Sequence, residues 1–229
     1  MISSETLKEA WEVVVSQFPF ALWETFYVTV VATFFAVLIG LPLGVLLVIG
    51  KKDGIRPISP VIMKILDFVI NILRSVPFLI LLVVVIPFTR LIVGTAVGTV
   101  ASIVPLIIAS FPFVARLVEG SLNEVDSHVV EMAQSVGASP LQIVIHVLLP
   151  EGLPSLLSNL TIAITTILSY QAMSGVVGGG GLGKVAINYG YYRYKYFIMI
   201  IAVVVLVLLV QLIQNVGTYV VHKCDKRLK

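Results

Sequence analysis

Five long apolar stretches constrain this chain more than any other feature of its sequence. They cover approximately residues 20–49, 61–86, 96–116, 153–175 and 196–221. A helix needs about 20 apolar residues to cross a hydrocarbon core about 30 Å thick, so each stretch is long enough to span a bilayer. Inside a membrane only helices and closed barrels satisfy their own backbone hydrogen bonds. Because no strand-type alternation is evident, the sequence predicts an all-α integral membrane protein with five transmembrane helices.

The composition agrees with a single transmembrane domain over residues 1–229. The chain is 59% hydrophobic and only 12% charged, against roughly 25% charged residues in a soluble domain. A formal charge of +3, scattered along the chain, does not indicate nucleic-acid binding. With one cysteine and three histidines, no disulfide and no metal-ligand cluster is indicated. We therefore expect no catalytic residues, no metal and no cofactor in this chain.

Residues 1–19 differ from the apolar stretches. They carry three glutamates, at positions 5, 9 and 12, and lack the basic region of a cleavable signal peptide. Apolar side chains recur on one side of the helix that these residues would form, at Trp11, Val14, Val15 and Phe18. This pattern predicts an amphipathic N-terminal helix that lies on the membrane surface.

Residues 128–150, here called the amphipathic loop, interrupt the apolar pattern between the third and fourth stretches. One apolar face recurs with helical spacing at Val129, Met132, Ala133 and Val136, and a second at Leu141, Val144, Ile145 and Leu148. Gly137 favours the left-handed conformation that ends a helix, and Ser139 before Pro140 is typical of a helix start. With Pro150 as a stop, the sequence predicts two short helices joined by a tight turn.

Basic residues near the spans predict the orientation of the chain. They gather in the first connector and in the C-terminal tail, at Lys51, Lys52, Arg56, Lys223, Lys226, Arg227 and Lys229. Four spans separate these two regions, so both are expected in the cytoplasm, with the N-terminus outside and residues 117–152 inside.

The predicted cytoplasmic loop, residues 117–152, is acidic. It carries Glu119, Glu124, Asp126, Glu131 and Glu151, and neither Lys nor Arg. Negative charge beside two apolar helix faces predicts a partner protein with an apolar cleft and a basic rim. Apart from Glu131, we expect most of these carboxylates to be solvated.

The second apolar stretch contains a polar stripe. Lys64, Asp67, Asn71 and Arg74 follow one another at steps of three and four and therefore share one helical face. Charges at membrane depth are costly and normally face a bundle interior or a cavity. Arg74 lies about 10–15 Å into the helix and needs a partner or water. Either Asn71, Arg74 and Ser75 line a pore, or Arg74 is a structural hydrogen-bonding anchor.

A spaced pattern within the amphipathic loop resembles a known signature. Glu131-Met132-Ala133 is followed after three residues by Gly137, after nine more by Val147, and after one more by Leu149-Pro150. This resembles the EAA loop of ABC-importer permeases, with Met132 and Val147 replacing an alanine and an isoleucine. The resemblance implies that these residues form a coupling helix, and that Glu131 faces a basic residue of a cytoplasmic ATPase.

Further segments are similar to the permeases of methionine importers: Arg74-Ser75-Val76-Pro77-Phe78, Ile86–Arg90, Ala172–Gly183 and Tyr189-Gly190-Tyr191. The resemblance implies a type I ABC importer permease fold in a bacterial inner membrane. It also implies a second copy of the chain, two cytoplasmic ABC ATPase subunits that hold ATP and Mg, and an external lipid-anchored substrate-binding protein. Surrounding membrane lipid is expected as well. The implied activity is methionine import by alternating access, with the D-isomer left open.

Three alternatives stay open: a permease for another amino acid or a small peptide, a membrane channel, and a membrane-bound enzyme. The glycine-rich residues 178–183 before Lys184 have the length of a phosphate-binding loop. Val185 follows, instead of the Ser or Thr that would hold magnesium, so nucleotide binding is not expected there. We expect the glycines to allow tight packing where two subunits and the binding protein meet. Met173 is either a gate on the symmetry axis or a gap-filling core residue.

Overall fold

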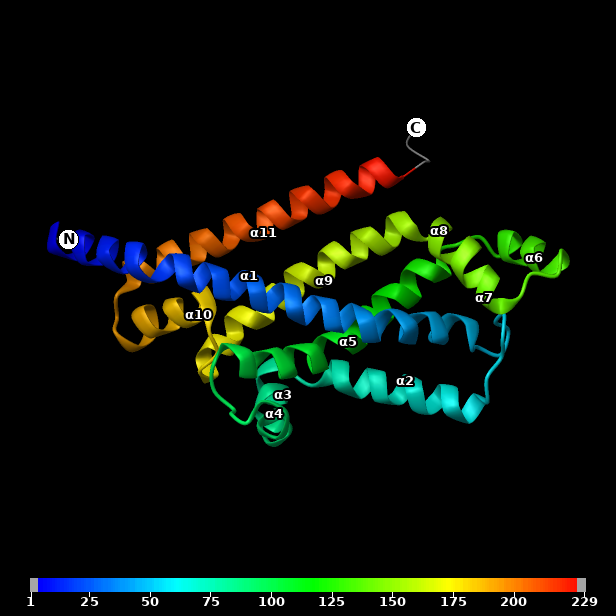
Figure 1. Cartoon of the computed structure of the whole chain (residues 1–229), viewed down its shortest axis with the longest axis horizontal. Helices are drawn as coiled ribbons and strands as arrows, with labels where there is room; N and C mark the ends of the chain where they lie inside the picture. Colours follow the sequence, from blue (N-terminus) through cyan, green and yellow to red (C-terminus); the bar gives the residue numbers. More distant parts are fainter. Residues whose placement is uncertain (1–3, 226–229) are drawn as a thin grey trace. The chain divides into compact units, whose positions relative to one another are not determined.

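The protein is described by a computed structural model that covers residues 4–225, so the first three residues and the last four lie outside it. Within this range all regular structure is helical (Figure 1). The α-helices are α1 (Ser4–Ile49), α2 (Pro60–Ser75), α3 (Phe78–Val84), α4 (Ile86–Val93), α5 (Thr99–Asn123), α6 (Ser127–Ser135), α7 (Pro140–Ile143), α8 (Leu149–Glu151), α9 (Leu153–Ser174), α10 (Gly181–Ala186) and α11 (Tyr196–Cys224). Two π-helices, η1 (Val144–Leu148) and η3 (Ile187–Tyr192), and one 3-10 helix, η2 (Gly175–Val177), connect them.

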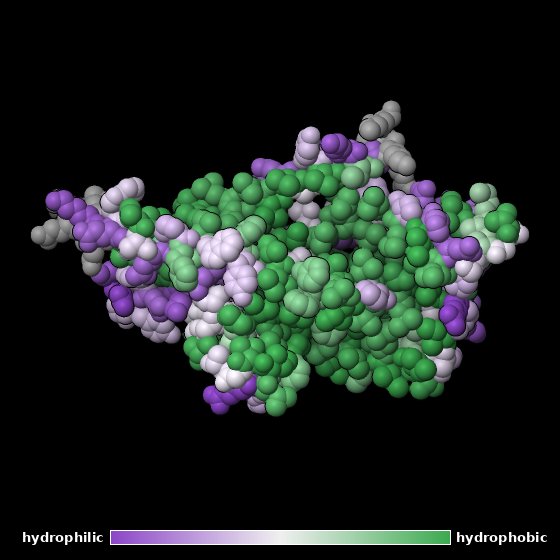
Figure 2. Space-filling view, in the orientation of Figure 1, coloured by the Kyte–Doolittle hydropathy of each residue, from purple (hydrophilic) through white to green (hydrophobic). Residues whose placement is uncertain are grey.

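Four helices in residues 4–225 are each long and apolar enough to cross a membrane: α1, α5, α9 and α11. The broken pair α2 and α3 supplies a fifth span if the two are taken together. Figure 2 shows that hydrophobic side chains cover most of the visible surface. Soluble proteins rarely expose apolar patches of this extent, whereas a membrane protein presents them to lipid.

The predicted span over 61–86 is not one helix. It breaks between Ser75 and Phe78, where Val76 adopts an extended conformation with ψ near 124°. Pro77 explains the break, because a proline disfavours helical geometry in the residue before it and lacks the N–H that would continue the helix. The prediction of a continuous helix was therefore wrong at this position.

The N-terminal segment and the first span form the single helix α1, without a break near residue 19. Part of the predicted surface helix is buried, because Ala10 and Phe18 join Ala21 in one hydrophobic cluster. The placement of residues 1–19 at a membrane surface stays a prediction. Helix α5 also runs further than predicted, to Asn123, so the connection to the amphipathic loop is shorter than the sequence indicated.

The chain divides into two compact units, which we describe separately. The first unit consists of Met1–Thr33, Pro77–Ile107 and Ile164–Ile213. Its core joins α1, α10, η3 and α11 through Ala10, Phe18, Ala21, Leu182, Val185, Ala186, Tyr189, Ile198 and Ala202. Phe78, the first residue of α3, stacks on Tyr170 of α9 with ring centroids 4.6 Å apart.

The second unit consists of Phe34–Val76, Ile108–Ala163 and Gln214–Lys229. In it the glycines of a Gly40-x-x-x-Gly44 pattern face α5. A Cβ atom on Gly40 would lie 2.8 Å from the carbonyl oxygen of Phe111, and one on Gly44 would lie 2.6 Å from that of Ala115. Small residues four apart allow two membrane helices to approach this closely. A buried cluster of Leu47, Met63, Ile70 and Ala115 lies beside this contact.

Candidate functional site

The amphipathic loop forms the two predicted helices, α6 and α7, with a turn at Gly137. Gly137 has φ of +80°, a left-handed conformation that favours glycine. Ser139 begins α7 as predicted, and its cap is reciprocal. The backbone N–H of Gln142 donates to Ser139 Oγ at 3.4 Å, and the backbone N–H of Ser139 donates to Gln142 Oε1 at 2.8 Å. This capping box satisfies two backbone donors at the helix start.

Asp126, which we expected to be merely solvated, begins α6. Its Oδ1 accepts a hydrogen bond from the backbone N–H of His128 at 2.9 Å and lies 2.8 Å from His128 Nδ1. The bond from the His128 backbone, followed by that from its ring, holds the pKa of Asp126 below its ordinary value. The hydrogen bond to Asp126 raises the pKa of His128, and the charges of Asp126 and Glu131 add to this effect.

The second apolar face of the amphipathic loop differs from the predicted one. Leu141 and Ile145 are exposed, whereas Ile143, Val144 and Leu148 are buried. The predicted face assumed continuous α-helical spacing, but residues 144–148 form the π-helix η1, which changes the angular register of the side chains. Nor does Pro150 end the helical turn, since α8 continues to Glu151.

The amphipathic loop carries an exposed apolar surface. Met132 is 68% exposed and Val136 is 84% exposed, and Leu141 and Ile145 extend the same character onto the second helix. Of the other signature residues, Glu131 and Pro150 are exposed, while Ala133, Val147 and Leu149 are half-buried. Exposed apolar side chains beside an exposed carboxylate are typical of a docking surface.

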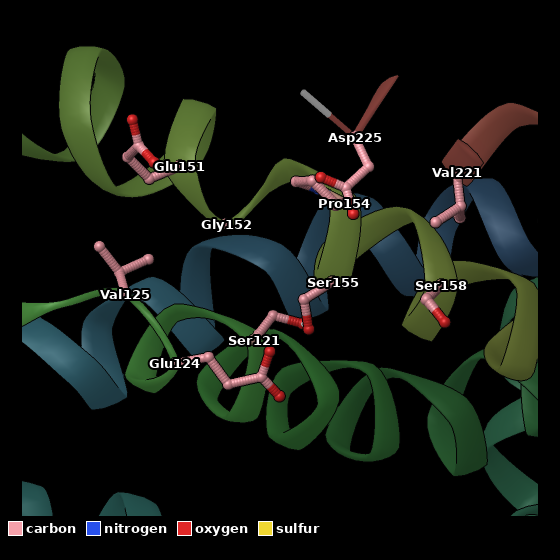
Figure 3. Close-up of a pocket in the computed structure, with 10 residues that line it drawn as sticks. All are labelled: Ser121, Glu124, Val125, Glu151, Gly152, Pro154, Ser155, Ser158, Val221 and Asp225. Atoms are coloured by element: carbon pink, nitrogen blue, oxygen red, sulfur yellow. The ribbon is translucent and has the colours of Figure 1, made fainter. Parts of the chain in front are cut away.

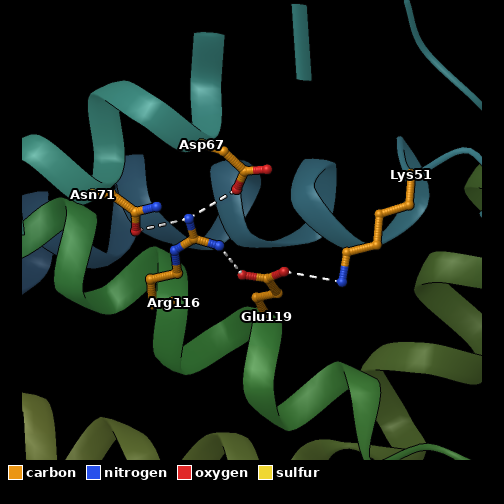
Figure 4. Close-up of polar contacts among 5 residues, drawn as sticks. All are labelled: Lys51, Asp67, Asn71, Arg116 and Glu119. Atoms are coloured by element: carbon orange, nitrogen blue, oxygen red, sulfur yellow. Dashed lines mark hydrogen bonds and ion pairs between the residues drawn. The ribbon is translucent and has the colours of Figure 1, made fainter. Parts of the chain in front are cut away.

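The polar stripe on α2 meets a residue that the sequence analysis did not single out, Arg116 of α5 (Figure 4). Arg116 Nη2 donates to Asp67 Oδ1 at 2.8 Å and to Asn71 Oδ1 at 3.0 Å. The sequence offered a signal, because Arg116 is an arginine at the end of an apolar stretch and such charges need partners. The other pathway candidates, Arg74 and Ser75, are exposed at the end of α2, where Ser75 Oγ donates to the backbone oxygen of Asn71.

Glu119 extends this group of charges. Its carboxylate lies 2.6 Å from Arg116 Nη1 and 3.0 Å from Lys51 Nζ. We expected Glu119 to be a solvated loop residue, but it belongs to α5 and its side chain is only 13% exposed. We call Lys51, Asp67, Asn71, Arg116 and Glu119 the charge cluster; it holds two cations and two anions.

A cavity of about 330 Å³ lies near the amphipathic loop, at the ends of α5 and α11 and the start of α9. Figure 3 shows the lining residues. They include three carboxylates and three hydroxyls: Glu124, Glu151, Asp225, Ser121, Ser155 and Ser158. The acidity of this region is evident in the sequence, but the cavity is not, because α5, α9 and α11 are distant in the sequence.

In the first unit, two side chains of α1 hold the glycine-rich segment. Glu24 accepts hydrogen bonds from the backbone N–H of Gly181, at 2.8 Å, and from the hydroxyl of Thr99. Thr25 Oγ1 accepts from the backbone N–H of Leu182 at 2.9 Å. These bonds satisfy donors that the start of α10 would otherwise leave unpaired. Tight packing is therefore present within the chain, between α1, α9 and α10. Packing of these glycines where two subunits and the binding protein meet stays a prediction.

Met173 occupies the last turn of α9, directly before this segment, and its side chain is 46% exposed in the single chain. A gap-filling residue of the chain's own core would be buried, so this exposure favours the alternative in which Met173 faces something outside the chain. Its place on the symmetry axis stays a prediction.

Over residues 40–222 the chain matches the protein family described as the binding-protein-dependent transport system inner membrane component. The chain belongs to this family. Among its relatives, the probable D-methionine transport system permease protein MetI of Vibrio cholerae is 52% identical over 207 residues, which cover 90% of this chain and 92% of the relative. The D-methionine transport system permease protein MetI of Escherichia coli K12 is 46% identical over 154 residues, 67% of this chain and 70% of the relative.

Solved structures of transporters share the fold of this permease. One, an inward-facing conformation of the MetNI methionine ABC transporter, is 45% identical with a TM-score of 0.87 and covers 89% of this chain and 94% of the other. Another, an amino acid ABC transporter, is 19% identical with a TM-score of 0.72 over 100% of both chains, and therefore supports the fold alone. The predicted class, an all-α integral membrane permease with the type I ABC importer fold, is confirmed.

Proposed function

We propose that this permease moves methionine across the bacterial inner membrane, driven by ATP that separate subunits bind with Mg and hydrolyse. The observation that carries the proposal is the amphipathic loop, because it displays the importer signature on two capped helices with an exposed apolar face. Methionine as the substrate is supported by the names of the relatives, one of which is 52% identical.

The coupling step uses the exposed surface of the amphipathic loop. Met132, Val136 and Leu141 enter an apolar cleft on the ATPase, and burying each such side chain contributes about 1.5–3 kcal/mol relative to its exposed state. Glu131 pairs with a basic residue at the rim of that cleft and fixes the orientation of docking. The left-handed turn at Gly137 holds the two helices at a defined angle, so movement of the ATPase is passed on to the spans.

The assembly contains two copies of this chain, two cytoplasmic ATPase subunits and an external lipid-anchored binding protein. The N-terminus lies outside and the C-terminus in the cytoplasm, as the basic residues predict. The spans of the two copies alternate between inward and outward access around a two-fold axis. Met173 is proposed as a gate on that axis, and Asn71, Arg74 and Ser75 as residues of the pathway.

Two measurements test the proposal. The ATPase subunit should co-purify with the permease, and vesicles containing the whole assembly should take up labelled methionine only when ATP is supplied. Uptake without ATP would favour the channel alternative, and uptake of another amino acid in preference to methionine would favour a permease of different specificity. A product formed from methionine in the membrane would favour the enzyme alternative.

Glu131→Lys tests the coupling surface directly. Because the substitution places a cation against the basic rim, we expect methionine uptake to be abolished and ATPase binding to weaken by at least about tenfold. Membrane insertion should be unchanged, because Glu131 is exposed. Glu131→Gln is the matched comparison, since it removes the charge without placing a cation at the rim and should weaken ATPase binding less. Normal uptake by Glu131→Lys would contradict the role of this carboxylate.

A further inference from the structure

We propose that Arg116 is a positioning residue for coupling, which fastens α2 and the connector after α1 to the part of α5 that leads into the amphipathic loop. Through this attachment, a displacement of the loop moves the helix that carries the pathway candidates. The inference rests on the proposed importer function, because it assigns a path within the chain for the movement that the ATPase supplies.

The contacts of Arg116 give it this role. One nitrogen of the guanidinium reaches Asp67 and Asn71 on α2, and the other reaches Glu119 on its own helix. A planar guanidinium holds several such bonds in a fixed geometry, which a flexible ammonium does not. The arginine side chain is only 19% exposed and that of Glu119 only 13%. Partial burial reduces screening by water and strengthens charge-assisted hydrogen bonds.

Lys51 adds a third element to the attachment. It lies two residues after the end of α1 and its ammonium is 3.0 Å from Glu119. The charge cluster therefore joins the end of α1, the middle of α2 and the last third of α5, with no net charge. All five residues belong to the second unit.

The connection from the charge cluster to the amphipathic loop is short. Glu119 lies about one turn before the end of α5 at Asn123, and only residues 124–126 separate α5 from α6. So short a segment leaves little freedom for the loop to move without α5. On the other side of the cluster, two helical turns of α2 lead from Asp67 to Arg74. A continuous helix transmits a displacement over this distance of about 10 Å because its rise is about 1.5 Å per residue.

Arg116 could act as a structural contact only or as a positioning residue, and these two roles predict different effects of substitution. Loss of a structural contact lowers the stability of the permease and reduces ATP hydrolysis and uptake together. Loss of the attachment leaves the docking surface intact, so the ATPase still binds and hydrolyses ATP, but less of its movement reaches α2. The ratio of methionine taken up to ATP hydrolysed separates the two cases.

The experiment uses the complete assembly of permease, ATPase and binding protein in vesicles, with hydrolysis and uptake measured in the same sample. Asp67→Asn removes the charge on α2, and Lys51→Met removes the attachment of the connector. We expect either variant to keep hydrolysis within about twofold of the unsubstituted protein and to lower uptake per ATP about two- to fivefold, because an ion pair with a half-exposed partner contributes at most about 1 kcal/mol. Asp67→Glu should restore most of the ratio, because Asp67 is half-exposed and a longer carboxylate has room to reach Arg116.

Lys52→Met is the matched control, because Lys52 is the exposed neighbour of Lys51 and makes none of the contacts of the charge cluster. It should leave the ratio unchanged. The inference is overturned if Asp67→Asn and Lys51→Met transport with an unchanged ratio, or if both activities fall in parallel with the unfolding temperature. Failure of the unsubstituted assembly to take up methionine with ATP would instead refute the proposed function.

Discussion

The turn between α6 and α7 offers a sharp test of how the amphipathic loop is held in shape. Gly137 has φ of +80°, and a Cβ atom added there would meet no other atom within 4 Å. Substitution by alanine therefore introduces backbone strain without a steric clash. Left-handed geometry costs a residue with a Cβ atom about 1–2 kcal/mol. The reduced freedom of the unfolded chain offsets about 0.4–1 kcal/mol of this.

The net destabilisation of the loop by Gly137→Ala is therefore about 1 kcal/mol, which corresponds to about a fivefold increase in its local opening. Hydrogen exchange measured on the assembled transporter should show faster exchange for the amides of Val136 to Ala138, whose hydrogen bonds close the turn. Gly137→Asn should exchange nearly as the unsubstituted protein does, because asparagine tolerates the left-handed region.

Gly120→Ala serves as the control. Gly120 lies in α5 without a positive φ, and a Cβ atom there also meets nothing within 4 Å. Alanine at that position should stabilise the helix by about 0.5–1 kcal/mol. The reasoning is refuted if Gly137→Ala exchanges no faster than Gly137→Asn, because the strain would then not depend on the left-handed conformation.

Two further predictions concern other parts of the chain. Gly183→Ala should lower the unfolding temperature of the purified permease by about 5 °C, because the new Cβ atom would overlap the backbone of Ala172; an unchanged temperature would contradict this close packing. The raised pKa of His128 should make α6 pH-dependent. The pair of His128 and Asp126 stabilises α6 fully below the pKa of His128 in the unfolded chain, and this stabilisation is lost as the pH rises through the higher pKa in the folded chain. The α6 amides should therefore lose protection as the pH rises through that window. His128→Gln should abolish that dependence, which hydrogen exchange corrected for the intrinsic rate would detect.

The amphipathic loop was predictable where its signals are local. Gly137, Ser139 and Pro140 determine the turn and the helix start through their own backbone preferences, and the structure shows both features where they were expected. The face of the second helix was not predictable in the same way. Periodicity assumes one residue spacing throughout, and the π-helix of residues 144–148 changes it. Within this π-helix Ile145 is exposed, whereas Val144 and Leu148 are buried.

The partners of the polar residues were the least predictable feature. Asp67 and Arg116 are 49 positions apart, and Glu24 and Gly181 are 157 apart. Helical spacing shows which residues share a face, as it did for the stripe on α2, but not which helix comes to lie against that face. Val76 was different, because the effect of the following proline is local, and a break could have been predicted there from the sequence.

Lipid surrounds every apolar face about equally well, so hydrophobicity alone does not determine which helices of a membrane protein pack together. In this chain two other features distinguish the pairs. Glycines admit close backbone contacts, as Gly40 and Gly44 do for α1 and α5. Polar side chains require specific partners, as Arg116 does on α2 and Glu24 does at α10. Because an unpaired charge in the membrane is costly, each such residue disfavours alternative arrangements of the helices. The few charged residues of an apolar chain therefore specify its packing, and those nearest the amphipathic loop are placed to pass on its movement.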